Sequence, residues 1–194
     1  LKSMDLEFQE VCTLQPTVFL SEKHPLARRK SLRTLFRTSS SAFGRKERFM
    51  IQRSHDDRML WAQFDSLEMG SGWDDTDILK PQIMVESVYG DSHPGSTHLN
   101  QLVEQAVYGV YEKGGKPAKY YATDICDGCA QGHDGMNVVL ASREAIANMV
   151  EVHASAVPWD GMILASSCDK SIPAHLKAAA RMDIPTLFMP GGSM

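Results

Sequence analysis

Along the second half of the chain, hydrophobic and polar positions follow two alternating periods. Residues 82–88 carry β-branched and apolar side chains in partial alternation, which predicts a strand. Residues 99–110 place an apolar side chain at every third or fourth position, which predicts an amphipathic helix. The glycine pair at 114 and 115 is typical of the end of such a helix. A second strand is expected at about 118–125.

The same alternation repeats toward the C-terminus. It predicts, in order, a helix at 142–157, a strand at 162–166, an alanine-rich helix at 173–182 and a strand at 184–189. Strands that alternate with helices of this length pair in parallel through crossover connections. The predicted fold class is therefore α/β, with a parallel sheet flanked by helices.

The first part of the chain has a different hydrophobic pattern, because no regular spacing of apolar residues is sustained before about residue 80. We expect a flexible, poorly ordered extension at 1–52, a lead-in segment at 53–79 and the α/β domain at 80–194. Every charged side chain from 23 to 46 is basic, with three serines at 39–41 among them. A mobile solvated tail and an organellar targeting segment both fit that composition, but the acidic residues at 5, 7 and 10 argue against targeting.

Charge and composition limit the classes of binding partner that we expect. The formal charge of −4 and the pI near 6.0 provide no general attraction to polyanions, so we expect no nucleic-acid partner. No apolar run approaches the ~18 residues that a membrane span needs, and we expect a cytoplasmic protein with no membrane partner. The four cysteines are widely scattered, which favours metal-binding, catalytic or core cysteines over disulfides in a reducing compartment.

Polar motifs follow three of the predicted strands. They are the stretches 90–93, 126–128 and 168–170. Ligands of parallel sheets bind at the carboxyl ends of the strands, where the loops that follow different strands meet. We therefore expect these three loops to converge on one site.

Two of these motifs place a soft thiolate directly beside a hard carboxylate, as Cys126-Asp127 and Cys168-Asp169. Thiolates suit iron or zinc and carboxylates suit magnesium, so the pairing indicates two different metals side by side. Core cysteines beside turn aspartates would give the same pattern. Cys126 and Cys129 also fit a redox pair or half of a structural zinc site, although a second cysteine or histidine pair at zinc-site spacing is missing.

The residues around these motifs are ambiguous by themselves. Lys170 fits a solvated surface lysine as well as a site residue. His93, His98 and His133 lie in or beside the loops, and we expect their rings to be satisfied by backbone groups, because their spacing matches no standard zinc set.

Longer stretches resemble a known family. Residues 124–147, which begin Asp-Ile-Cys-Asp-Gly-Cys-Ala-Gln-Gly, are similar to the long signature of the dihydroxy-acid and 6-phosphogluconate dehydratases. Ser-Cys-Asp-Lys-Ser-Ile-Pro at 167–173 follows at the family's usual distance, and 178–186 and 190–194 continue the match. The resemblance is collinear over about 78–194 and implies the N-terminal portion of the family's first domain.

The resemblance implies a hydro-lyase that removes water from a 2,3-dihydroxy acid to give a 2-keto acid. It implies that Cys168 ligates an iron-sulfur cluster and that Asp127 and Asp169 hold Mg²⁺. It implies that Lys170 is carbamylated, which would turn its amine into a third oxygen donor for Mg²⁺. The implied partner is a small-molecule substrate, and the full-length protein is expected to be a homo-oligomer.

One departure from the family bears on the cofactor. Members with a [2Fe-2S] cluster carry a cysteine where this chain has Gly95, and glycine cannot ligate iron. Cys126 is the obvious substitute, as in the 6-phosphogluconate type, and Cys129 is expected to pack rather than ligate. This favours a [4Fe-4S] over a [2Fe-2S] cluster and a sugar-acid substrate, with a branched-chain 2,3-dihydroxy acid as the alternative.

The resemblance places other functional residues beyond position 194: a third cysteine, a magnesium-binding glutamate and the serine base. We therefore expect residues 1–194 to be inactive when isolated. The competing hypothesis is an inactive truncated remnant, or a non-enzymatic α/β interaction module that keeps the motifs without the chemistry.

Overall fold

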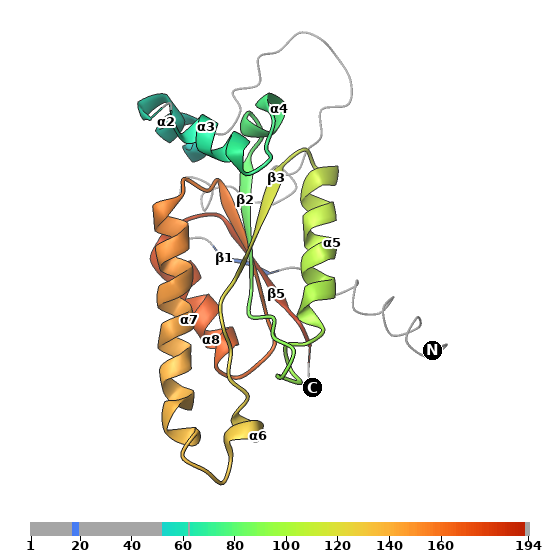
Figure 1. The fold of residues 1–194 in the computed structure, drawn as a ribbon, viewed down its shortest axis with the longest axis vertical. Coiled ribbons are helices and arrows are strands. Elements are labelled where there is room, and N and C mark those ends of the chain that lie inside the picture. Colours follow the sequence, from blue (N-terminus) through green and yellow to red (C-terminus); the bar gives the residue numbers. More distant parts are fainter. Residues whose placement is uncertain (1–16, 20–51, 62, 193–194) are drawn as a thin grey trace, which may run out of the picture.

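The computed structural model describes residues 17–19, 52–61 and 63–192, which form one five-stranded sheet with helices on both faces (Figure 1). The strand order is β1-β5-β4-β2-β3. The strands are β1 (Thr17–Phe19), β2 (Gln82–Ser87), β3 (Lys116–Tyr121), β4 (Gly161–Ser166) and β5 (Thr186–Pro190). β2, β3, β4 and β5 pair in parallel, while β1 pairs antiparallel with β5. The predicted α/β class with a parallel sheet is confirmed.

The helices divide between the faces and the two ends of the sheet. They are α2 (Arg53–Leu60), α3 (Gln63–Gly70), α4 (Asp75–Ile78), α5 (Leu99–Glu112), α6 (Asp127–Ala130), α7 (Met136–Ala156) and α8 (Ser171–Met182). α5 covers one face, and α7 and α8 pack together on the other (Figure 1). The lead-in helices α2, α3 and α4 lie at the end where β2 begins, and α6 lies at the opposite end.

The core explains why the sheet is sandwiched in this way. Successive residues of β2 point to opposite faces, so that Met84 packs toward α7 and α8 and Val85 packs toward α5, and both are 0% exposed. Every residue of β4 is buried, as expected for a parallel strand covered by helices on both faces. The sheet is thereby fixed, and the residues after its strands are held at a single edge.

Two predicted boundaries are wrong, for local reasons. β3 ends at Tyr121 rather than near 125, because its neighbour β2 ends at Ser87, which lies opposite Tyr121 in the parallel register. α7 begins at Met136 rather than near 142, because Ser142 is inside the helix and its hydroxyl donates to the Val139 carbonyl at 2.7 Å instead of capping an N-terminus.

The predicted end of the helix that precedes Gly114 is confirmed. Gly114, which follows α5, has a φ of 79°, and the amides of Gly114 and Gly115 bond back to Tyr111 and Val110 at 3.0 Å each. Among the helices that the structure describes, none is long and apolar enough to cross a membrane.

The predicted flexible extension at 1–52 is described only at its β1 residues and at residue 52. β1 is an edge strand that the local sequence pattern did not predict. The basic stretch at 23–46 lies outside the described residues.

Candidate functional site

Three loops meet at the carboxyl edge of the parallel strands. We name them loop A (88–98, after β2), loop B (122–127, after β3) and loop C (167–170, after β4). Loop A contacts loop B through Ser96 Oγ and Asp124 Oδ2, at 3.5 Å, and contacts loop C where Ser167 Oγ donates to the Gly95 carbonyl. Loops B and C are joined by Lys170 and Asp127. The predicted convergence of the three loops is confirmed.

The centre of this site is one ammonium held by two carboxylates. Lys170 Nζ donates to Asp127 Oδ2 at 2.7 Å and to Asp169 Oδ2 at 2.6 Å. Asp127 begins α6, and Lys170 is the N-cap residue directly before α8, so the starts of two helices bring the side chains together. The Asp127 and Asp169 carboxylates raise the pKa of Lys170, and Lys170 in turn lowers the pKa of Asp169.

Burial excludes one interpretation of Lys170. The residue is 9% exposed, so the hypothesis of a solvated surface lysine is wrong. A buried lysine with two carboxylate partners is typical either of a structural ion-pair cluster or of a functional site.

The oxygen donors of this cluster fit Mg²⁺. Asp127 Oδ1 is buried and has no hydrogen-bond partner among the described residues, while its other oxygen is held by Lys170. A buried carboxylate oxygen without a partner is costly, and a hard cation would satisfy it. In the described ranges, no three His, Cys, Asp or Glu side chains are grouped to hold a metal ion. A third oxygen donor would therefore have to be Lys170 itself, as a carbamate, or lie elsewhere.

The cysteines border this cluster. Cys168 and Cys126 are both buried, at 9% exposed each, and each directly precedes one of the aspartates. Burial raises the pKa of the Cys168 thiol, and its Sγ lies 3.5 Å from Asp169 Oδ1. Thiols are soft ligands that suit the iron of an iron-sulfur cluster, and carboxylates are hard ligands that suit Mg²⁺. Two buried thiols beside two carboxylates therefore fit these two metals as neighbours.

Cys129 differs from the packing role that we expected, because its side chain is exposed. α6 is a single turn, and it turns Cys129 outward while Cys126 at its start stays buried. A hydrogen bond with the Cys126 thiol raises the pKa of Cys129.

Two of the loop histidines bond as predicted. His98 Nε2 lies 2.6 Å from the Gly191 carbonyl. His133 Nε2 lies 3.0 Å from the Cys129 carbonyl, and its Nδ1 accepts the Gly135 amide at 3.0 Å. Backbone groups satisfy both ring nitrogens of His133 and Nε2 of His98.

Sequence analysis missed a buried carboxylate, Asp124. Its side chain is 1% exposed, and its Oδ2 lies 3.4 Å from Nε2 of His93, which is itself buried. The sequence held only a weak signal, an acidic residue after a strand and two positions before Cys126, and it did not show the partner or the burial.

A second missed carboxyl lies under loop B. Glu86 on β2 is fully buried, and its Oε1 accepts the Ala122 amide at 2.7 Å. Burial raises the pKa of Glu86 to about 8, so this carboxyl is mainly protonated at neutral pH. It supports Ala122, the first residue of loop B, without adding a full negative charge beneath that loop.

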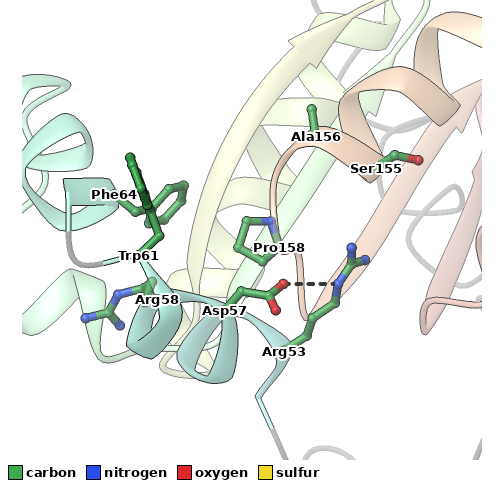
Figure 2. A pocket seen from close by; sticks show the side chains of 8 residues that line it. All are labelled: Arg53, Asp57, Arg58, Trp61, Phe64, Ser155, Ala156 and Pro158. Carbon is green, nitrogen blue, oxygen red and sulfur yellow. Dashed lines mark ion pairs between the residues drawn. The ribbon is translucent and has the colours of Figure 1, made fainter.

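A shallow pocket lies away from these loops. Figure 2 shows Arg53, paired with Asp57 at 3.6 Å, facing Pro158 and the end of α7. Pro158 precedes β4, so this pocket borders the amino ends of the strands and not the edge where parallel sheets bind ligands. None of the predicted site residues lines it.

Comparison with known proteins identifies the family. Residues 80–194, more than half of the chain, match the sequence model described as dihydroxy-acid/6-phosphogluconate dehydratase N-terminal. The chain belongs to the dihydroxy-acid/6-phosphogluconate dehydratase family. The matched region contains all of the sheet except β1, together with loops A, B and C.

Curated relatives of this family agree. The chain is similar to the dihydroxy-acid dehydratases of Halothermothrix orenii (44% identical), Methanosarcina barkeri (41%) and Methanothermobacter thermautotrophicus (44%), over 129 residues each. The aligned part is 66% of this chain but only 23% or 24% of each relative. The chain therefore matches about a quarter of the length of these dehydratases.

Proposed function

We propose that this chain forms the metal-binding part of a hydro-lyase that converts a 2,3-dihydroxy acid to a 2-keto acid. The observation that carries the proposal is the cluster at the carboxyl edge, where Asp127 and Asp169 converge on Lys170 Nζ at 2.7 and 2.6 Å. Membership of the dehydratase family and the names of the relatives support the same reaction class.

For magnesium, the ligands on this chain would be Asp127, Asp169 and a carbamylated Lys170. Bound there, Mg²⁺ would neutralise the substrate carboxylate and the enolate character that develops next to it. An ammonium offers no lone pair to a metal, whereas a carbamate offers hard oxygens. Carbamylation requires Lys170 Nζ to lose a proton, and the two aspartates oppose that loss while they hold the ammonium.

For the iron-sulfur cluster, the ligands on this chain would be Cys126 and Cys168. The cluster would supply an iron that acts as a Lewis acid on the leaving hydroxyl. We favour the [4Fe-4S] type, because Cys126 stands at the end of loop B while loop A has Gly95 in place of a thiol.

The residues of this chain then have distinct tasks. Asp127 and Asp169 bind and orient, with Asp127 Oδ1 as the oxygen that is free of a protein partner. Cys168 and Lys170 are each 9% exposed, whereas the Asp169 side chain is 60% exposed, so this chain leaves the site open on the Asp169 side. The reaction removes the proton at C2 and the hydroxyl at C3, and the resulting enol tautomerises to the 2-keto acid. No described residue is proposed as the base.

The substrate is tested by assaying the full-length protein, purified without oxygen, on a panel of acids. Because Gly95 and Cys126 resemble the 6-phosphogluconate type, we expect 2-keto acids to form faster from sugar acids such as gluconate, xylonate or their phosphates than from a branched-chain 2,3-dihydroxy acid. A clear preference for the branched-chain acid would overturn the substrate assignment but leave the reaction class intact. No dehydration of any acid in the panel would overturn the proposed function.

A further inference from the structure

A second polar cluster, beside the proposed metal ligands, joins loop A to loop B. It consists of His93, Ser96 and Asp124, which we call the loop clamp. His93 is 4% exposed and Ser96 is 0% exposed, and the side chain of Asp124 is 1% exposed. Three polar side chains that are buried this deeply are retained at a cost unless they bond to one another or hold something in place.

The His93 ring lies between the backbone of loop A and Asp124, and Nδ1 is the ring nitrogen that makes a hydrogen bond. Nδ1 accepts the Gly95 amide at 3.1 Å, so Nδ1 carries no proton and the proton resides on Nε2. Nε2 is buried 3.4 Å from Asp124 Oδ2, and it makes no hydrogen bond to any described residue. The ring therefore has no free nitrogen with which to act as a base, and its Nε2–H is left to interact with the nearby Asp124 carboxylate.

Asp124 connects the clamp to the backbone of loop B, which carries the proposed ligands Cys126 and Asp127. Its Oδ1 accepts the Ile125 amide at 2.8 Å, while its Oδ2 faces His93 and Ser96. The carboxylate thus fixes the backbone immediately before Cys126 and Asp127. Loop B has no strand partner to hold it at this point, because β3 has already ended at Tyr121.

We propose that His93, Ser96 and Asp124 are positioning residues that orient Asp127 for metal binding. This inference rests on the proposed function, because it assumes the metal site at Asp127, Asp169 and Lys170. Partners that orient metal ligands without touching the metal typically change affinity by about 10–100-fold when they are removed. The clamp acts in the same way, through the loop backbone.

The test measures the dissociation constant of Mn²⁺, used as a paramagnetic stand-in for Mg²⁺, in the full-length protein with bicarbonate present. His93→Ala is expected to weaken Mn²⁺ binding by about 10–100-fold. His93→Gln, which can still place an N–H donor toward Asp124, is expected to recover most of the affinity. Ser96→Ala removes only a hydroxyl and should weaken binding by less than His93→Ala does.

His133→Ala is the matched control. His133 accepts the amide two residues ahead on Nδ1, as His93 does, but it is exposed and makes no contact with Asp124. Its loss should leave the dissociation constant unchanged. If His93→Ala leaves the dissociation constant of Mn²⁺ unchanged, as His133→Ala is expected to do, the clamp does not position loop B.

A double variant separates positioning from general destabilisation. His93→Ala and Asp124→Asn should weaken binding together by no more than the stronger single change, because each removes the same interaction. Losses that multiply would refute the clamp, and so would loss of affinity in His93→Gln equal to that in His93→Ala. Asp127→Asn tests the metal site itself: if it leaves Mn²⁺ binding intact, the proposed function fails rather than the clamp alone.

Discussion

Replacing Lys170 with arginine is expected to lower the dehydration rate of the full-length enzyme by more than about 100-fold, since several kcal/mol of metal-derived stabilisation would be lost. Arginine keeps the positive charge between Asp127 and Asp169, so the fold and the iron-sulfur absorption should survive. It cannot be carbamylated, so the third oxygen donor is missing. Steady-state kinetics, with the spectrum recorded on the same sample, measure both effects.

Lys177→Arg on the same helix is the matched control. Lys177 lies on α8 and pairs with Glu144, but its side chain is 41% exposed. Surface substitutions of this kind usually change stability by less than ~0.5 kcal/mol and should leave the rate unchanged. Near wild-type turnover by the Lys170→Arg enzyme would remove the carbamate from the mechanism.

Replacing Cys168 with serine is expected to remove most of the iron and sulfide from the anaerobically purified enzyme, together with its brown colour and its activity. Serine is close in size to cysteine, but its hydroxyl is a poor ligand for iron compared with a thiolate. Iron and acid-labile sulfide analysis gives the result without reference to turnover.

The cysteines of loop B and α6 provide the comparison. Cys126→Ser should reduce iron content as Cys168→Ser does, whereas Cys129→Ser should not, because Cys129 is exposed and is not proposed as a ligand. Unchanged iron and sulfide in Cys168→Ser would show that the ligand assignment is wrong. Loss of iron in Cys129→Ser would instead indicate that Cys129 of the C-x-x-C pair is a cluster ligand.

The sequence predicted the features that depend on local periodicity and chain order. The alternating periods from residue 82 onward gave parallel β2, β4 and β5 with the helices between them, and the glycine at 114 marked the end of α5. The meeting of loops A, B and C followed from topology, because parallel strands end at one edge. None of these predictions needed knowledge of a side-chain contact.

Features that depend on distant partners were missed. The end of β3 is set by the end of β2, which lies 34 residues before Tyr121 in the chain (121 − 87). β1 pairs with β5 across most of the described chain, and a three-residue segment has no period of its own to indicate this. The first five residues of α7 include exposed apolar side chains such as Val138 and Leu140, so no amphipathic pattern marked its start.

Some residues of the candidate site could likewise be recognised from the sequence, and others could not. Cys126, Asp127, Cys168 and Asp169 stand in recognisable dipeptides, and the resemblance assigned their roles. Lys170 could not be classified from its own sequence, because its burial depends on Asp127, 43 residues away. The pair of His93 and Asp124 and the buried carboxyl of Glu86 became visible only when the loops were placed in space, because burial and partners define them.

The central claim is that Asp127, Asp169 and a carbamylated Lys170 form one metal site. Chemical trapping tests it most directly: the full-length protein, equilibrated with ¹³C-bicarbonate and Mg²⁺, is treated with an alkyloxonium reagent that esterifies carbamates, and its peptides are analysed by mass spectrometry. The account predicts a ¹³C-labelled carbamate ester on the peptide that carries Lys170, with no such label on Lys177. An unlabelled Lys170, in protein shown by kinetics to be active, would contradict the account.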